Sequence, residues 1–243
     1  AGMAVAAKMR ADIGSLNQSV RNTNDAISLV NTYDGAAQEI ESILIRMREL
    51  AVQTRNGTYE AADRTNADYE YTALKNEITR IAGVSAFNRM TVGQGSSGAA
   101  GGTGVADTSF TFYVGSDVAK TGNSISFSAK ALDLNLAVSS STLNSVVDAT
   151  SAGQAIATLD DAITELAANR AQAGALINRL EHTVSNLMNV SQRLQEAVSG
   201  IEDADYAAES ANLARGMVLA QAGTAMLAQA NQAPQYILSL LRG

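Results

Sequence analysis

The chain has 243 residues, of which 46% are hydrophobic and only 5% aromatic, and its formal net charge at pH 7 is -7. An acidic chain without a basic run argues against nucleic acid and anionic membrane surfaces as partners. Because it contains no cysteine, a disulfide, a thiolate nucleophile and a cysteine-based metal site are excluded as well. No apolar stretch is long enough to cross a bilayer, so no membrane span is predicted.

A first long helix is predicted over residues 1–55. Apolar residues recur three and four positions apart over residues 9–30, slip in phase near Tyr33, and resume as far as Ala51. The dipeptide Asn56-Gly57 is a turn signal that ends this helix.

A shorter helix is predicted over residues 65–82. Thr65 and Asp68 have the spacing of a capping box at its start, and Gly83 is a stop signal at its end. A short helix that follows a long one after a turn doubles back beside it, so the two are expected to form a helical hairpin. The apolar face of the short helix carries Leu74, Ile78 and Ile81.

The glycine-rich segment between Thr91 and Thr108 has no periodicity and is predicted to be a surface loop. Gly93, Gly95 and Gly98 match the pattern G-x-G-x-x-G, but the dinucleotide fingerprint needs a hydrophobic strand before it and a helix at its end. Neither flank provides these elements, so nucleotide binding is disfavoured and no cofactor is predicted.

Hydrophobic residues at alternate positions then predict a β-hairpin. The first run lies in residues 110–114 and the second in residues 125–129, with a turn signal at residues 121–123 between them. Leucines at alternate positions in residues 132–136 predict a third extended segment. The buried face of the hairpin is expected to carry Phe110, Phe112 and Phe127.

A second long helix is predicted over residues 156–201, roughly 70 Å at the usual rise per residue, with Ser151 as its N-cap. Its 3.5-residue apolar spacing requires other helices against one stripe. Arg170 is the one charged residue on that stripe, and it is expected either to pair with a carboxylate on a neighbouring helix or to extend into solvent. The apolar stripe comprises Ile156, Leu159, Ile163, Leu166, Ala173, Ile177, Leu180, Val184, Leu187, Leu194, Val198 and Ile201.

A last helix is predicted over residues 206–233, with Asp205 as its cap and Pro234 as a stop or a kink. It carries few charges, and an apolar tail at residues 237–241 follows it. Such a helix is unfavourable when alone in water, so it is expected to need partners.

Candidate catalytic and metal-binding residues are few. Glu202, Asp203, Asp205 and Glu209 form an acidic cluster, but they lack the alternating spacing of a calcium loop, so capping roles are expected. His182 is the only histidine and is predicted to be a solvated helix residue, which disfavours a triad or a zinc site. No acid, base and nucleophile converge on one segment, so no catalytic residue, metal or enzymatic activity is predicted.

These elements predict a mainly α fold, in which long antiparallel helices form a rod-like coiled-coil bundle with a small β-hairpin subregion. The expected divisions are two N-terminal rod helices in residues 1–90 and a glycine-rich loop with the hairpin in residues 91–150. A C-terminal rod helix follows in residues 151–200, and a terminal helix with its tail in residues 201–243.

Two sets of sequence blocks, one towards each end of the chain, carry a family resemblance. The first set is NDAISL at 24–29, RMRELAVQ at 46–53, NEITRI at 76–81 and FN at 87–88. The second set is IEDADYA at 201–207, QAGTAMLAQANQ at 221–232 and LSLLR at 238–242. Both sets resemble bacterial flagellin, in that family's order, and they cover most of residues 1–90 and 150–242.

This resemblance implies an exported, extracellular subunit that polymerises into the bacterial flagellar filament used for swimming. It implies other flagellin subunits as partners, together with an export chaperone and the filament cap and junction proteins. The first helix starts without a cap, which indicates that the family's N-terminal segment is missing. The helix from Tyr206 would then lack its natural partner, and the shortened chain is expected to stay monomeric.

The resemblance also implies a surface for the flagellin-sensing Toll-like receptor of animal hosts, carried onto Arg46, Leu50 and Glu70. The same residues are expected in contacts between subunits, as a carboxylate-binding fork, an apolar anchor and a paired charge. Two alternatives stay open. One is a flagellin-like surface protein that binds polysaccharide through Tyr113, and the other is the hook–filament junction protein.

Overall fold

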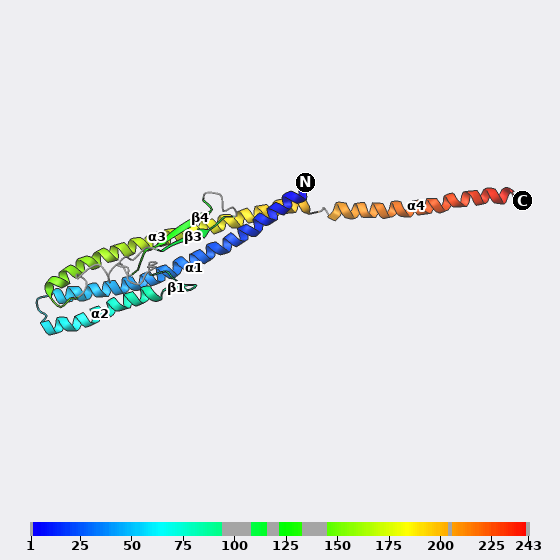
Figure 1. Ribbon diagram of the computed structural model, residues 1–243. Helices are drawn as coiled ribbons and strands as arrows, with labels where there is room; N and C mark the ends of the chain where they lie inside the picture. The colour runs from blue at the N-terminus through cyan, green and yellow to red at the C-terminus, as the bar shows by residue number, and fades with distance from the viewer. Residues whose placement is uncertain (1, 94–107, 116–121, 133–144, 204–205, 242–243) are drawn as a thin grey trace. The chain divides into compact units, whose positions relative to one another are not determined.

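The computed structural model describes residues 2–93, 108–115, 122–132, 145–203 and 206–241 (Figure 1). It divides into two compact units, one of Ala11–Leu194 and one of Ala1–Arg10 with Gln195–Gly243. The mainly α fold with a small β-hairpin, predicted from the sequence, is confirmed. In chain order the elements are α1 (Gly2–Arg55), α2 (Ala61–Val84), β1 (Ala86–Phe87), β2 (Met90–Thr91), β3 (Thr108–Tyr113), β4 (Ser124–Ala129), α3 (Ala149–Glu202) and α4 (Tyr206–Leu241).

The larger unit has one continuous hydrophobic core, to which α1, α2, α3 and the β3–β4 hairpin all contribute (Figure 1). On α3 the predicted stripe is buried at every seventh residue, from Leu159 to Leu187. Between these positions the buried residues include Ala162 and Leu176, one position before the predicted Ile163 and Ile177, which are half-buried. The buried face is therefore broader than a two-helix seam, because α3 packs into a core shared by several elements.

Helix α2 begins at Ala61, so the predicted start and capping box at Thr65 and Asp68 are wrong. The Glu60 N–H donates to the Asp63 carboxylate at 3.4 Å instead. Thr65 lies inside the helix, where its hydroxyl donates to the Ala61 carbonyl at 2.9 Å, a usual arrangement for a helical threonine. The predicted end is also early, because the helix was expected to end at residue 82 before a stop at Gly83, whereas α2 ends two residues later at Val84.

The β3–β4 hairpin forms as predicted, with Phe110 opposite Phe127 and Phe112 opposite Ile125. Phe127 is 5% exposed, and its ring meets Tyr33 of α1 edge-on at a centroid distance of 5.4 Å. Phe110 and Phe112 are half-buried and pack against the same core. The aromatic face of the hairpin therefore fixes it onto α1. Of the third extended segment predicted over residues 132–136, all but Leu132 lies outside the described residues.

The two-residue strands β1 and β2 form a second, short β-hairpin, which the sequence analysis did not predict. Asn88 and Arg89 form its turn with φ values of 48° and 65°, the left-handed pair that the usual two-residue hairpin turn requires. Asparagine tolerates this region, but the absence of glycine leaves little signal in the sequence.

Asp148 caps α3, so the prediction that Ser151 is its N-cap is wrong. One carboxylate oxygen of Asp148 accepts hydrogen bonds from the N–H groups of Thr150 and Ser151, at 2.9 and 2.8 Å. The other accepts the Ser151 hydroxyl at 2.8 Å. Aspartate caps well because it satisfies N–H groups that have no partner inside the helix and carries charge that the helix N-terminus favours.

This cap makes helix stability depend on pH. Hydrogen bonds from the Ser151 N–H and hydroxyl lower the pKa of Asp148 below its ordinary value of 3.8. A lowered pKa in the folded state adds stability above the unfolded pKa, and this stability is lost as pH falls through the folded value. We expect Asp148→Ala to lower the melting temperature by a few degrees at neutral pH, with the difference shrinking in acid.

Circular dichroism melting across the acid range measures this effect. Asp148→Asn is the matched control, because asparagine also caps helices but does not titrate. A difference between the wild type and Asp148→Ala that stays constant down to the most acid point would contradict the assignment of the cap.

Gly93 lies where the backbone passes close to α2. A Cβ added there would be 2.7 Å from the Ala82 carbonyl oxygen, and the Gly93 carbonyl accepts the Leu132 N–H at 2.8 Å. This packing explains the glycine without any nucleotide, while Gly95 and Gly98 lie outside the described residues.

We therefore expect Gly93→Ala to destabilise the protein by roughly 1–3 kcal/mol, the usual range for overpacking. In α1 a Cβ added at Gly14 would meet nothing within 4 Å, so Gly14→Ala serves as the opposite control. It is expected to stabilise the helix by about 0.5–1 kcal/mol. Urea titration of both variants measures the change in the free energy of unfolding, which should fall for Gly93→Ala and rise for Gly14→Ala. Equal stabilities of the two variants would contradict the close approach at Gly93.

Helix α4 runs from Tyr206 to Leu241, so the predicted end at residue 233 is wrong and the helix continues past Pro234. A proline removes one backbone hydrogen bond, and the structure shows that this loss does not end the helix. The start at Tyr206 is as predicted, whereas the expected cap Asp205 lies outside the described residues. Within the described part of the chain, no helix is both long and apolar enough to span a membrane.

Candidate interaction surfaces

Arg46 of α1 and Glu70 of α2 form an ion pair that links the two helices. Arg46 donates from Nε to Glu70 Oε1 at 2.9 Å, and its Nη1 reaches Glu49 Oε2 at 3.1 Å. The hydrogen bonds to Glu70 and then Glu49 raise the pKa of Arg46 above its ordinary value. Both side chains of the interhelical pair remain about half exposed, so their outer faces are accessible to a partner.

Leu50 is placed differently from the other two members of the predicted set. Its side chain is only 2% exposed, and it belongs to the core shared by α1, α2 and α3. The exposed apolar side chains nearby on α1 are Ile45, at 46% exposure, and Val52, at 49%. Beside them Arg48 pairs with Asp160 of α3. This face of α1 therefore presents apolar side chains and arginines held by ion pairs on both flanks.

Arg170 joins α3 to α1 inside the larger unit. Its Nε donates to Asp34 Oδ1 at 2.9 Å, and its Nη1 donates to Glu41. The Asp34 and Glu41 hydrogen bonds raise the pKa of Arg170, and all three side chains are less than one-third exposed. Of the two roles that the sequence left open, pairing with a neighbouring helix is the one observed. Because Asp34 and Glu41 are seven residues apart on one face of α1, the fork fits only one register of the two helices.

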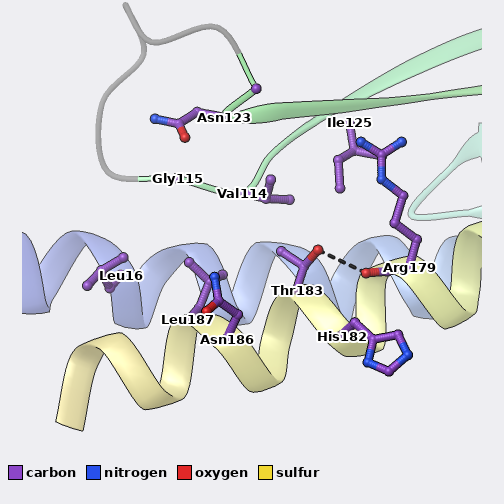
Figure 2. A pocket seen from close by; sticks show the side chains of 11 residues that line it. Leu16, Val114, Gly115, Asn123, Ile125, Arg179, His182, Thr183, Asn186 and Leu187 are labelled. Atoms are coloured by element: carbon purple, nitrogen blue, oxygen red, sulfur yellow. Dashed lines mark hydrogen bonds between the residues drawn. The ribbon is translucent and has the colours of Figure 1, made fainter. Parts of the chain in front are cut away.

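An open groove of about 460 Å³ lies between the end of the β3–β4 hairpin and helices α1 and α3 (Figure 2). Both the hairpin side and the helix side of the groove carry apolar and polar side chains, and Arg179 extends from α3 towards Ile125 of the hairpin (Figure 2). Tyr113 ends β3 next to this groove, is 52% exposed, and its carbonyl accepts the Asn22 amide at 3.4 Å. The lining residues used below are Val114, Asn123, Ile125, Arg179, Thr183 and Leu187.

The remaining predicted candidates do not form a reactive site. His182 is exposed at the edge of the groove on α3. In the acidic cluster Glu202 pairs with Arg10, and Asp203 accepts the Ser199 hydroxyl. Among the residues that the structure describes, no group of three or more histidine, aspartate or glutamate side chains could hold a metal ion.

Helix α4 presents apolar side chains on all sides. From Leu213 to Leu227 the large apolar residues are 62–71% exposed, although α4 carries few charges. The apolar stripes of α1 and α3 within the larger unit are buried, whereas the apolar side chains of α4, which belongs to the smaller unit, are exposed. A monomeric protein rarely leaves so many contiguous apolar side chains in water, so this helix has the character of an interface.

Comparison with known proteins decides the family. Residues 1–97 match the model of the bacterial flagellin N-terminal helical region, and residues 156–241 match that of the C-terminal helical region. The chain belongs to the bacterial flagellin family. This flagellin is 40% identical over 244 residues to a flagellin of Halalkalibacterium halodurans. The matched region covers all of this chain and 84% of that relative.

Two further likenesses agree in sequence and in structure. This flagellin is 39% identical to the flagellar filament 33 kDa core protein of Treponema phagedenis, over 99% of the chain and 85% of that protein. The crystal structure of Bacillus cereus flagellin matches with a TM-score of 0.56 and 34% identity, covering 69% of this chain and 88% of that one. The family is structural and non-enzymatic.

Sequence reasoning missed two parts of these surfaces. It did not identify Asp34 and Glu41 as the partners of Arg170, although their seven-residue spacing on α1 is a usable signal. It also missed the groove, because its walls come from three segments that are far apart in the sequence.

Proposed function

We propose that this flagellin is a structural subunit that self-assembles with copies of itself into the extracellular flagellar filament for motility. The observation that carries the proposal is the exposed apolar surface of α4. Its large side chains, from Leu213 to Leu227, are more than 60% exposed in the subunit and need a partner to bury them. The names of the relatives, which include a flagellar filament core protein, support the same assignment.

Burial of these side chains would drive assembly. Each large apolar side chain contributes about 1.5–3 kcal/mol when it moves from water into a packed interface. A helix that is apolar on all sides can contact several neighbours at once. Open helical polymers arise from such head-to-tail contacts, because each subunit offers two different surfaces that never close a ring.

Light scattering and electron microscopy of the purified flagellin test the proposal. Concentrating the native full-length protein, as purified from cells, with preformed filament fragments as seeds, is expected to give long filaments above a critical concentration. Residues 1–243 on their own are expected to stay monomeric. A native protein that stays monomeric at all concentrations in the presence of seeds would argue against self-assembly. By family resemblance we also propose that an export chaperone and the filament cap and junction proteins bind this flagellin before or at the end of assembly.

The Arg46–Glu70 face supports a second binding role, recognition by the flagellin-sensing Toll-like receptor of animal hosts. The half-exposed pair offers charge to a partner, Ile45 and Val52 offer apolar area, and buried Leu50 fixes the position of α1 beneath them. Reporter cells that express the receptor provide the test, with the variant Arg46→Glu. Arg80→Glu, which changes an exposed arginine paired within α2, is the matched control.

Polysaccharide binding is the alternative function, and the groove beside Tyr113 is the observation that favours it. Tyr113 is exposed at the end of β3, one residue before Val114 in the groove wall, and the groove itself offers the polar side chains of Asn123 and Thr183. Sugar sites combine an aromatic ring with polar groups of this kind. Calorimetry with glycans tests it, since binding should disappear in Tyr113→Ala while the fold is kept. The hook–filament junction protein is the less favoured reading, because whole-chain identities of 39–40% are to a flagellin and a filament core protein.

A further inference from the structure

The turn between α1 and α2 contains the only Asn-Gly pair in the sequence, Asn56-Gly57. Both residues are exposed, and the turn is closed by the Tyr59 N–H, which donates to the Asn56 carbonyl at 3.4 Å. Among the described residues, neither the Gly57 N–H nor the Asn56 side-chain amide makes a hydrogen bond. The backbone nitrogen of Gly57 and the side-chain amide carbon (Cγ) of Asn56 are therefore free to react with each other.

We propose that Asn56-Gly57 is a self-modification site, at which Asn56 deamidates through a cyclic imide and Arg64 directs the product to isoaspartate. The reaction depends on the geometry of this turn and not on filament assembly.

The first step needs no other reactant. The Gly57 backbone nitrogen loses its proton to solvent and bonds to Cγ of Asn56. The Cγ–Nδ2 bond breaks, and the amide nitrogen leaves as ammonia after taking a proton from water. Glycine permits the attack because it has no Cβ to obstruct the approach and the backbone is free to rotate. A five-membered cyclic imide remains, with Gly57 nitrogen joined to both carbonyl carbons of residue 56.

Arg64 acts on the second step. Its Nη2 donates to the Asn56 backbone carbonyl oxygen at 3.1 Å. A cationic donor on that oxygen polarises the carbonyl and stabilises the charge that develops when water adds to its carbon. Addition there breaks the bond from this carbon to the Gly57 nitrogen, so the chain continues through Cγ and the former backbone carbonyl becomes a carboxylate. This product is isoaspartate, whereas addition at Cγ gives aspartate.

The structure also favours the isoaspartate product once it has formed. Arg64 Nε is buried and has no hydrogen-bond partner among the described residues. The new carboxylate offers two oxygens where Arg64 already contacts one, so Nε and Nη2 can bind it as a fork. The exchange of a neutral acceptor for a charged one gives Arg64 its missing partner and adds one negative charge to the turn.

Peptide mapping by mass spectrometry of the full chain, incubated at mildly alkaline pH, tests the first step. Deamidation replaces NH2 by OH, and the mass difference identifies the residue. Asn66 is the internal comparison, because it is exposed but lies within α2 and precedes alanine. We expect Asn56 to deamidate at least about tenfold faster than Asn66, which corresponds to a difference of about 1.4 kcal/mol in activation free energy. Equal rates at the two residues would overturn the proposal.

Gly57→Ala is the matched variant. A Cβ at this position would meet nothing within 4 Å, and the backbone of Gly57 does not have a left-handed conformation, so the variant should fold normally. Its Cβ obstructs the attack, and deamidation at Asn56 is expected to slow by about tenfold. An unchanged rate in a folded Gly57→Ala protein would show that the cyclic imide is not the route.

The ratio of isoaspartate to aspartate tests the role of Arg64. We expect this ratio to be several-fold higher in the folded wild type than in the same chain unfolded in urea. Arg64→Gln should return the ratio of the folded protein to the unfolded value, while a purely structural role for Arg64 would leave it unchanged. The same ratio in all three samples would contradict the assignment to Arg64.

Discussion

Replacing Leu219 and Leu227 together by aspartate is expected to abolish filament formation. Both side chains are about two-thirds exposed on α4 in the subunit, so the change should leave the melting of the larger unit unchanged. We propose that neighbouring subunits bury the same residues in the filament, where an unpaired buried carboxylate costs several kcal/mol. The critical concentration should therefore rise by at least about a hundredfold, since each 1.4 kcal/mol is a factor of ten.

Sedimentation of seeded solutions measures this change. The matched control is Leu219→Met with Leu227→Met, which keeps the apolar character and volume of both positions and should assemble as the wild type does. Filaments formed by the aspartate variant at normal concentration would show that this part of α4 stays in water, and the role given to α4 would then be wrong.

Arg170→Met is expected to give the largest loss of stability among single changes of charged residues on α3. It leaves Asp34 and Glu41, on one face of α1, without the cation that both bind. Removal of one partner from a buried ion pair costs about 3–5 kcal/mol, and because these groups are nearly one-third exposed we expect about 1–3 kcal/mol. Urea unfolding followed by circular dichroism gives the value directly.

Two comparisons separate the ion pair from the arginine itself. Arg179→Met changes an exposed arginine nine residues along the same helix and should alter stability by less than about 0.5 kcal/mol. In a background with Asp34→Asn and Glu41→Gln, the further change Arg170→Met should cost much less, because no carboxylate is left unpaired. An equal cost in both backgrounds would show that the carboxylates do not interact with Arg170.

The elements that could be predicted from the sequence are those set by hydrophobic periodicity. Phe110, Phe112 and Phe127 alternate within their runs, and a period of two residues places them on one face of a hairpin whatever the rest of the chain does. The stripe on α3 was predicted for the same reason, as a repeat of 3.5 residues needs a helix. Its width could not be predicted, because it depends on how many elements pack against α3.

Helix starts could not be predicted where a side chain bonds far along the sequence. Asp68 was assigned to a local capping box, but its carboxylate accepts the N–H of Val146 at 2.7 Å and joins α2 to the segment before α3. Ser151 and Asp148 both have capping side chains, and only the geometry shows that Asp148 accepts the N–H groups. In both cases the residue type indicates a side chain that accepts a backbone N–H, but the sequence does not indicate which N–H it accepts.

The candidate surfaces divide in a similar way. For Arg170 the sequence leaves open either pairing with a carboxylate or extension into solvent, because an unpaired charge on an apolar stripe is costly, and pairing is observed. Leu50 was assigned to a binding surface by resemblance alone, and helical spacing did not reveal that it is 2% exposed. Exposure depends on the neighbouring helix, so resemblance transfers the position of a residue more reliably than its accessibility.

Amide hydrogen exchange of α4 in the monomer and in the seeded filament tests the central proposal most directly. Peptides covering Leu213 to Leu227 should exchange quickly in the monomer, because α4 has no tertiary burial there, and should become strongly protected in the filament. Peptides from the core of α1 around Leu44 serve as the reference, since they should be protected in both states. Exchange in α4 that is equally fast before and after assembly would contradict the proposal that this helix buries its apolar surface between subunits.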